Sequence, residues 1–363
     1  MKKLVLATPL YPPEAGGPAT FAKILEEALP ERGWKVEVVK FVDVRHHPKF
    51  LRHLVYGWRV FKKAWRADMV LALDPVSTGL PAFIAAHFAG KPFFVRIAGD
   101  YAWEQGVQRW GISETLDVFV SRRKLPLGVR ALKAVQTFVA RRAKRIIVPS
   151  KYLARIVTLW DISPLFIQVA YNGIPEVQEE YPQPEISGPY IVTVGRLVPW
   201  KGMGVVIEAF TVLSKTHKKL SLVIVGDGPE RAKLEARIRN LGLGERVICT
   251  GNVSHEETLS WLSHAEVFVL NTRYEGLSHL ILEAFALATP VATTHAGGNR
   301  ELISEGETGL VFSYADQAGI VECVSDLMKN KKLKTKITKN AAALCSEFTN
   351  ARMVNAVIEV LSV

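Results

Sequence analysis

Several features that define common classes of protein are absent from this sequence of 363 residues. No apolar run reaches the roughly 18 residues needed to cross a bilayer, so we expect no membrane-spanning helix. The nine histidines show no HExxH-type spacing, and we expect neither a metal held by protein ligands nor another resident cofactor. Three cysteines, Cys249, Cys323 and Cys345, are too few and too far apart for a disulfide framework, which predicts reduced thiols in a cytoplasmic protein.

Acidic residues are scarce in the first half of the chain. Residues 1–180 contain 27 Lys and Arg but 16 Asp and Glu, whereas residues 181–363 contain 19 of each, so the net charge of +11 belongs to the first half. A basic half predicts an anionic partner, either a phosphate-rich polymer or a membrane surface. Zinc-finger, RNP-like and helix-turn-helix patterns are missing, and we therefore expect no nucleic-acid partner.

Short β-branched apolar runs alternate with helical patterns along the chain, which is typical of parallel sheets covered by helices on both faces. The first run, residues 4–10, ends at Tyr11 and two prolines, so it predicts a buried strand and not a signal peptide. The expected strands are residues 3–8, 36–42, 68–73, 92–97, 145–149, 167–171, 190–194, 222–225, 247–250, 267–270, 291–294 and 310–312. The expected helices of the second half are residues 203–215, 230–241, 255–263, 279–288 and 316–329.

A linker divides the chain. Residues 175–189 contain four prolines and four glutamates, a composition unsuited to the interior of a helix or strand. We therefore expect an α/β fold in which two doubly wound, Rossmann-like domains face each other across a ligand-binding cleft. The expected parts are a first domain at residues 1–176, a linker at 177–189, a second domain at 190–345 and a C-terminal helix at 346–363 that packs back on the first domain.

Two cations follow the expected strand 190–194. Arg196 and Lys201 lie five residues apart in a loop with glycine and proline, at the end of a strand where ligands bind in this class of fold. A guanidinium fork and an ammonium point charge suit a pair of phosphates, although an ordinary solvated loop is the alternative. The turn at residues 226–229 fits either the floor of a cleft or a plain connection between strand and helix.

Two glutamates stand eight residues apart around the start of a helix. Glu275 lies in a glycine-bearing loop, and Ser278 marks the expected N-terminus of the helix, where backbone N–H groups favour an anion. Glu283 lies two turns into an otherwise apolar helix and needs a partner, for example the two hydroxyls of a ribose. A role in complementing the helix dipole accounts for one glutamate but not for both.

Together these motifs resemble glycosyltransferase family 4, the retaining transferases with the GT-B fold. The resemblance is strong over residues 190–312 and looser before them. It is carried in the second half by Arg196 and Lys201, the pair Glu275 and Glu283, and Gly297-Gly298 with Glu301, and in the first half by the glycine loop 12–17 and the segments 148–150 and 171–174.

The resemblance implies an enzyme that moves a sugar from a nucleotide-diphosphate donor, bound by the second domain, to an acceptor on the side of the first domain. Arg196 and Lys201 bind the diphosphate and offset the charge of the leaving group, Glu275 holds hydroxyls of the donor sugar, and Glu283 holds the ribose. The donor-binding residues implied in this way are Gly16, Gly17, Arg196, Lys201, Asn252, Val253, Glu275, Ser278, His279, Leu280 and Glu283.

The sequence departs from the family on the acceptor side. Many members carry a histidine at the end of a first-domain strand, whereas here the strand 92–97 is followed by Ala98-Gly99-Asp100. Asp100 is therefore the candidate that orients or deprotonates the acceptor hydroxyl. The alternative is a structural Asp100 that caps the next turn or pairs with Arg96 or Arg109, in which case an oxygen of the leaving phosphate takes the proton.

A basic amphipathic helix is expected within residues 45–66, which contain seven Lys and Arg and no acid. Its apolar stripe consists of Leu51, Leu54, Val55, Trp58, Phe61 and Trp65. Either the stripe packs into the core of the first domain while the charges are solvated, or the helix binds an anionic membrane, and both hold if the basic flank alone touches lipid. The residues expected at a membrane or acceptor surface are Arg52, Trp58, Arg59, Lys62 and Lys63.

We therefore expect a hexosyltransferase of the retaining type, peripheral on the cytoplasmic face of the membrane, that acts on a glycan or lipid-linked acceptor. The alternative is an epimerase of the GT-B fold or another protein that binds nucleotide sugars. The donor sugar, its base, and the acceptor depend on loops whose geometry the sequence does not reveal.

Overall fold

The computed structural model describes residues 1–14, 16–174, 177–178 and 180–363. Ala15 of the expected glycine loop, Glu179 of the expected linker, and residues 175–176 lie outside the described residues. The chain forms two compact units. The first unit comprises Met1–Gly173 and Thr349–Val363, and the second unit comprises Ile174–Phe348.

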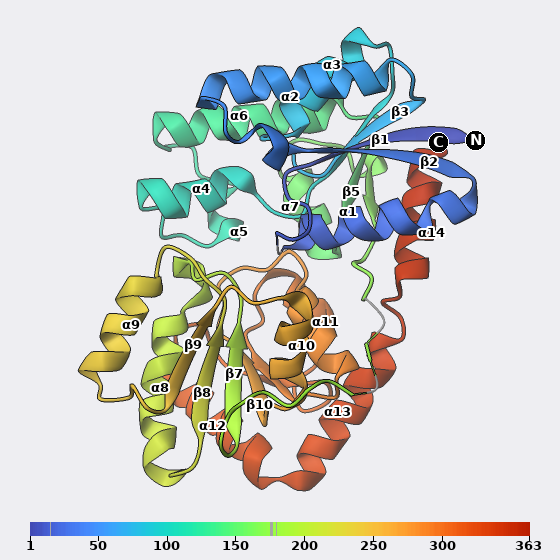
Figure 1. The fold of residues 1–363 in the computed structure, drawn as a ribbon. Helices are drawn as coiled ribbons and strands as arrows, with labels where there is room; N and C mark the ends of the chain where they lie inside the picture. Colours follow the sequence, from blue (N-terminus) through green and yellow to red (C-terminus); the bar gives the residue numbers. More distant parts are fainter. Residues whose placement is uncertain (15, 175–176, 179) are drawn as a thin grey trace. The chain divides into compact units, whose positions relative to one another are not determined.

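The first unit is built on a parallel six-stranded sheet with the order β2-β1-β3-β4-β5-β6 (Figure 1). Leu4 in β1 pairs with Val36 in β2 on one side and with Met69 in β3 on the other. The central strands consist almost entirely of buried residues, as expected when helices cover both faces. The strands are β1 (Lys2–Thr8), β2 (Trp34–Lys40), β3 (Met69–Ala72), β4 (Phe93–Arg96), β5 (Arg145–Val148) and β6 (Ile167–Val169).

Helices cover both faces of this sheet. Figure 1 shows α2, α3 and α6 on one face and α1 and α14 on the other. Val354 and Val357 of the C-terminal helix α14 share a core with Phe21 of α1 and with β-strand residues such as Leu6. The helices are α1 (Gly17–Ala28), α2 (Lys49–Ala64), α3 (Gly79–Phe88), α4 (Tyr101–Trp110), α5 (Leu116–Phe119), α6 (Leu127–Arg142), α7 (Lys151–Thr158) and α14 (Asn350–Leu361), with 3-10 turns η1 (Pro30–Arg32), η2 (Phe41–Val44) and η3 (Pro164–Phe166).

The second unit has a parallel six-stranded sheet with the order β12-β11-β10-β7-β8-β9. The strands are β7 (Tyr190–Val194), β8 (Ser221–Val225), β9 (Val247–Gly251), β10 (Val267–Leu270), β11 (Val291–Thr293) and β12 (Leu310–Val311). The helices are α8 (Met203–Thr216), α9 (Arg231–Asn240), α10 (His255–Ser263), α11 (His279–Ala286), α12 (Gln317–Lys329) and α13 (Lys331–Cys345), with 3-10 turns η4 (Pro199–Lys201) and η5 (Gly297–Glu301).

The core of the second unit follows the predicted apolar runs. Strand residues such as Ile191 and Val269 are fully buried against Phe210 of α8 and Val324 of α12. Every expected strand and every expected helix of the second half is present within two residues at each end, whereas the C-terminal helix expected at 346–363 begins only at Asn350. The doubly wound α/β class is confirmed in both units. Among the helices that the structure describes, none is both long and apolar enough to cross a membrane.

Candidate functional site

The sheet of the second unit reverses its winding direction between β7 and β10. The chain runs from β7 outward to β8 and β9, then returns to pair β10 on the other side of β7. In open parallel sheets, ligands bind outside the carboxyl ends of the strands at such a switch point. The loop after β7 carries Arg196 and Lys201, and the loop after β10 carries Glu275. The fold therefore brings the two strongest sequence motifs to the same point.

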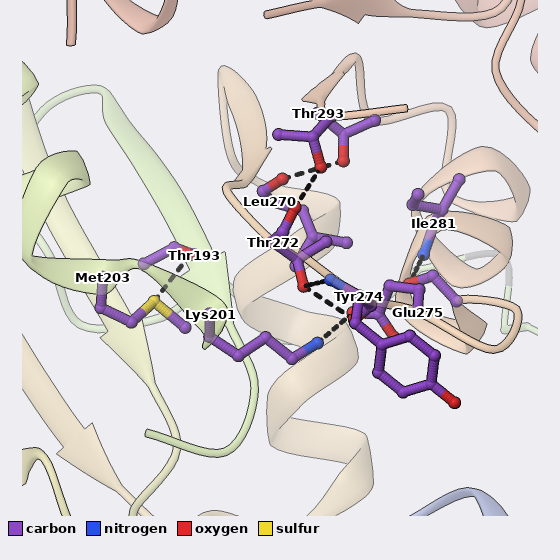
Figure 2. A network of polar contacts seen from close by, with 11 residues as sticks. Thr193, Lys201, Met203, Leu270, Thr272, Tyr274, Glu275, Ile281 and Thr293 are labelled. Carbon is purple, nitrogen blue, oxygen red and sulfur yellow. Dashed lines mark hydrogen bonds and ion pairs between the residues drawn. The ribbon is translucent and has the colours of Figure 1, made fainter. Parts of the chain in front are cut away.

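Lys201 and Glu275 form an ion pair at this switch point (Figure 2). Lys201 Nζ donates a hydrogen bond to Glu275 Oε1, and the two side chains are only 12% and 15% exposed. A phosphate oxygen is an acceptor of the same charge type as a carboxylate. Lys201 is thus placed to exchange its carboxylate partner for a phosphate, which would release Glu275 to bind hydroxyl groups.

Asn271, fully buried directly after β10, cross-links the loops around this pair. Its Nδ2 donates to the Gly202 carbonyl at 2.9 Å, and its Oδ1 accepts from the Ala315 backbone N–H at 3.1 Å. A further backbone bond runs from Arg273 N to Trp200 O at 2.8 Å. The Asn271 side chain and this backbone bond therefore hold the loop after β7 against the loop after β10, independently of the ion pair.

The glycine pair 297–298 supports the loop that presents Glu275. Gly298 N donates to Glu275 O at 2.9 Å, and a Cβ at position 298 would lie 2.0 Å from Gly276 O. Only glycine permits so close an approach between two backbones. This contact within the second unit explains why position 298 is a glycine.

Ser278 caps α11 as expected, because its Oγ accepts a hydrogen bond from Ile281 N at 3.3 Å. His279 and Leu280 form the first turn and are half-buried. Leu280 Cδ1 lies 3.9 Å from the point where a Cβ on Gly195 would be placed. The first turn of α11 therefore borders the loop that carries the two cations.

Glu283 is 6% exposed, and in the described part of the chain its carboxyl group makes no hydrogen bond. Burial raises the pKa of Glu283 to about 8. His255 Nε2 lies 3.9 Å from Glu283 Oε1, and partial burial lowers the pKa of His255. Both groups are therefore neutral near pH 7 and form no ion pair. The residues that the structure describes therefore do not supply the hydrogen-bond partner that the sequence predicts for Glu283.

Arg196 is exposed and forms no ion pair within the described ranges. Near pH 7 the charges of Lys201 and Glu275 offset each other and Glu283 is neutral, so among these four groups the positive charge of Arg196 is not balanced. Asn252 and Val253 follow β9 at the same edge, the first exposed and the second half-buried. This arrangement suits an anionic ligand with an extended uncharged part.

In the first unit, Gly16 and Gly17 start α1, and Gly16 has a φ of 147°. Asp100 is fully buried and caps α4, since its Oδ1 accepts from Trp103 N at 2.8 Å. Burial raises the pKa of Asp100, opposed in part by hydrogen bonds including those from Trp103 and Gln136. Asp100 therefore has the structural role that the sequence offered as an alternative, the cap of the next turn. The role as an acceptor base stays a prediction.

The basic segment is folded as expected, but its apolar stripe does not face the core. Buried Tyr56, Val60 and Ala64 of α2 face the first sheet, whereas Trp58 is 56% exposed. Of the predicted stripe, Leu51, Leu54, Trp58 and Trp65 are exposed and Val55 and Phe61 are half-buried, so the hypothesis that this stripe packs into the core is wrong. Lys63 Nζ donates a hydrogen bond to Val38 O of β2 at 3.2 Å, so this predicted surface cation is bound to the sheet. Of the other predicted surface cations, Arg59 and Lys62 are exposed and Arg52 is half-buried.

Two residues of the site were not found from the sequence. Asn271 is a polar residue directly after four apolar strand residues, a signal that could have identified it. His255 beside Glu283 had no such signal, because the two residues belong to different helices, α10 and α11. Glu301 lies at the end of η5, where it is half-buried.

Residues 177–344 match the model of the family described as "Glycosyl transferases group 1". Alpha-D-kanosaminyltransferase of Streptomyces kanamyceticus is 36% identical over 156 residues, which are 43% of this chain and 40% of that protein. The lipopolysaccharide core biosynthesis glycosyltransferase LpsE of Rhizobium meliloti is 29% identical over 177 residues, which are 48% of this chain and 50% of that protein. The chain thus spans half or less of the length of these two relatives.

Similarity to solved structures extends over the whole chain. HepE of Anabaena, solved in complex with UDP and glucose, superimposes with a TM-score of 0.79 at 19% identity and covers 100% of both chains. At this identity the likeness concerns the fold. Together with the two six-stranded parallel sheets it confirms the predicted GT-B fold.

Proposed function

We propose that this chain, whose residues 177–344 match the glycosyl transferases group 1 family, transfers a sugar from a nucleotide-diphosphate donor to an acceptor hydroxyl. The observation that carries the proposal is the ion pair of Lys201 and Glu275 at the switch point between β7 and β10. It combines a phosphate-binding cation with a hydroxyl-binding carboxylate in one nearly buried contact.

Each part of the donor has a matching group. Arg196 and Lys201 bind the diphosphate, together with the backbone N–H groups of the first turn of α11. Glu275, released from Lys201, accepts hydrogen bonds from the donor sugar. Glu283 is a buried carboxyl group that makes no hydrogen bond to any residue the structure describes, and two ribose hydroxyls would satisfy it.

The chemistry follows from these placements. The bond between the anomeric carbon and the β-phosphate oxygen breaks, and its electron pair stays on the phosphate. Arg196 and Lys201 stabilise this developing negative charge, which is the main electrostatic contribution to catalysis in such a site. The acceptor oxygen forms the new bond to the anomeric carbon. Its proton passes to the leaving phosphate, or to Asp100 if that residue reaches the acceptor.

We further propose that transfer retains the anomeric configuration and that the acceptor is a glycan or a lipid-linked sugar at the cytoplasmic face of a membrane. The family resemblance supports retention. The excess of basic residues in the first half supports an anionic surface or a phosphorylated acceptor, and the three free cysteines support a reducing compartment.

A binding experiment tests the donor site directly. Thermal unfolding of the whole chain is followed with UDP, GDP, ADP and their sugar derivatives, since a ligand of the folded state raises its apparent stability. One nucleotide series should raise the melting temperature of wild type and fail to do so for Lys201→Ala. Lys218→Ala, an exposed lysine elsewhere in the second unit, is the matched control and should respond as wild type does. No shift with any nucleotide would contradict the proposal.

The alternative activity is separated by product analysis. A transferase releases nucleoside diphosphate only as acceptor is consumed, whereas an epimerase converts the donor without any acceptor. Donor conversion in the absence of acceptor, with the sugar still attached to the nucleotide, would therefore favour the epimerase.

A further inference from the structure

Helix α2 carries two apolar faces, and only one of them packs against the protein. Tyr56, Val60 and Ala64 recur at helical spacing and are fully buried against the first sheet. With about 3.6 residues per turn, residues 50, 54, 58, 61 and 65 fall on a second stripe turned away from that face. An amphipathic helix that only completes a core needs no such second stripe.

The second stripe is aromatic and exposed. Phe50 is 85% exposed, Leu54 62%, Trp58 56% and Trp65 63%. Phe61 connects the two tryptophans, with ring centroids 5.6 Å from Trp58 and 5.8 Å from Trp65. The row is therefore preformed in the folded chain and does not depend on a partner for its shape.

Helix α3 extends the apolar surface on one side of α2. The two helices lie side by side in Figure 1, and a Cβ on Gly57 of α2 would lie 3.4 Å from Pro81 of α3. Phe88 at the end of α3 is 73% exposed and Ile84 is 44% exposed. Apolar side chains from two neighbouring helices thus reach solvent on the same face of the first sheet.

Basic residues lie on the other side of the aromatic row. Lys62 Nζ lies 5.3 Å from the centre of the Trp58 ring, and Arg59 is 3.8 Å from Asp43, an exposed pair of little strength. Arg66 is exposed beyond the end of the helix, and α2 contains no acidic residue. The face therefore combines tryptophan, aliphatic side chains and positive charge.

We propose that the aromatic row of α2, extended by Phe88 of α3, inserts into an anionic lipid bilayer while the basic flank of α2 binds the lipid headgroups. Tryptophan and long basic side chains are favoured at the boundary between headgroups and acyl chains, and each basic residue near the surface adds attraction to anionic lipid. Asp43 and Glu37 offset only Arg59 and Lys63, so Lys62 and Arg66 leave this flank with a net positive charge that matches anionic lipid. The inference rests on the membrane placement proposed above but not on the transfer chemistry.

Vesicle binding of the whole chain tests the inference. Wild type is sedimented with vesicles of phosphatidylcholine alone and with vesicles that contain 30% phosphatidylglycerol, at low and at high salt. Binding should require the anionic lipid and weaken with salt. Trp58→Ser with Trp65→Ser should lower the partition constant by about ten-fold or more, and Lys62→Glu with Arg66→Glu should lower it at low salt in particular. Leu165→Ser, a residue 85% exposed in η3, is the control and should bind as wild type does.

Tryptophan fluorescence reports insertion separately from attachment. Vesicles with brominated acyl chains should quench the emission of wild type, and the quenching should be lost when Trp58 and Trp65 are replaced by phenylalanine although sedimentation persists. Equal sedimentation of wild type and Trp58→Ser/Trp65→Ser would overturn the proposal. A change from dimer to monomer in that variant, without vesicle binding by wild type, would also overturn it and identify a second copy as the occupant. Vesicle binding without any nucleotide binding would refute the proposed transferase activity but would support the membrane surface on α2.

Discussion

Replacing Glu283 by glutamine tests whether the buried carboxyl group of α11 lowers the free energy of unfolding when it ionises. The pKa of Glu283 is raised by burial from 4.5 to about 8, so between these pH values the folded chain holds a proton that the unfolded chain releases. For an acid with a raised pKa the folded state is favoured by protonation. Stability from this group therefore falls as pH rises from 4.5 to about 8 and is constant outside that window.

The size of the effect follows from the two pKa values. At about 1.4 kcal/mol per pKa unit, the penalty is about 1 kcal/mol near pH 5.5 and about 4–5 kcal/mol near pH 8.5, a difference of about 3 kcal/mol. Glutamine cannot ionise and lacks this penalty. For a domain of this size, the gap in melting temperature between Glu283→Gln and wild type should widen by roughly 6–12 °C over that interval.

Differential scanning calorimetry at both pH values measures the gap, and the comparison with wild type cancels the titration of other groups. The transition of the second unit is followed by itself, because a chain with two units need not unfold in one step. Glu256→Gln, at an exposed position of α10, is the matched control and should show no widening. A gap for Glu283→Gln that is equal at the two pH values would refute the description of Glu283 as a buried and protonated acid.

The other predictions concern the loops and the acceptor side. Glu275→Gln removes the carboxylate partner of Lys201, so calorimetric titration should show roughly five-fold tighter binding of free nucleoside diphosphate while transfer falls by about 100-fold or more; weaker nucleotide binding would contradict the exchange of partners. Gly298→Ala should destabilise the second unit by more than about 2 kcal/mol and abolish transfer, whereas Gly244→Ala, which meets open space, should be nearly neutral; equal melting curves would refute the role of the close contact. Asp100→Asn keeps an oxygen for the cap and should slow transfer without changing nucleotide affinity; an unchanged kcat would leave Asp100 with the cap alone.

The sequence predicts the elements of this fold well because strands and helices are local patterns. The apolar run 267–270 and the cap Ser278 each specify an element through neighbouring residues. The order of strands in each sheet is not local. That β10 returns to pair with β7 places Lys201 beside Glu275, although 74 positions separate the two residues.

Side-chain contacts between distant segments explain what sequence reasoning missed. The glycine at position 298 could be recognised as a motif, but its reason, the approach to Gly276 O, exists only in the folded unit. Likewise the periodicity of α2 permits either apolar face to be buried. Tyr56 is buried and Trp58 is exposed because α2 packs on the sheet and on α3 with the face that carries Tyr56.

The central claim is that a sugar leaves a nucleotide for an acceptor at the site of Lys201 and Glu275. The most direct measurement follows the anomeric carbon of a ¹³C-labelled nucleotide sugar by NMR, using the nucleotide that the binding experiment selects and a membrane fraction as acceptor. The account predicts that the labelled carbon enters a new glycosidic bond with the configuration it had in the donor, with equal release of nucleoside diphosphate by wild type and none by Lys201→Ala. A labelled sugar that changes configuration while still attached to the nucleotide, or that is not consumed, would contradict the account.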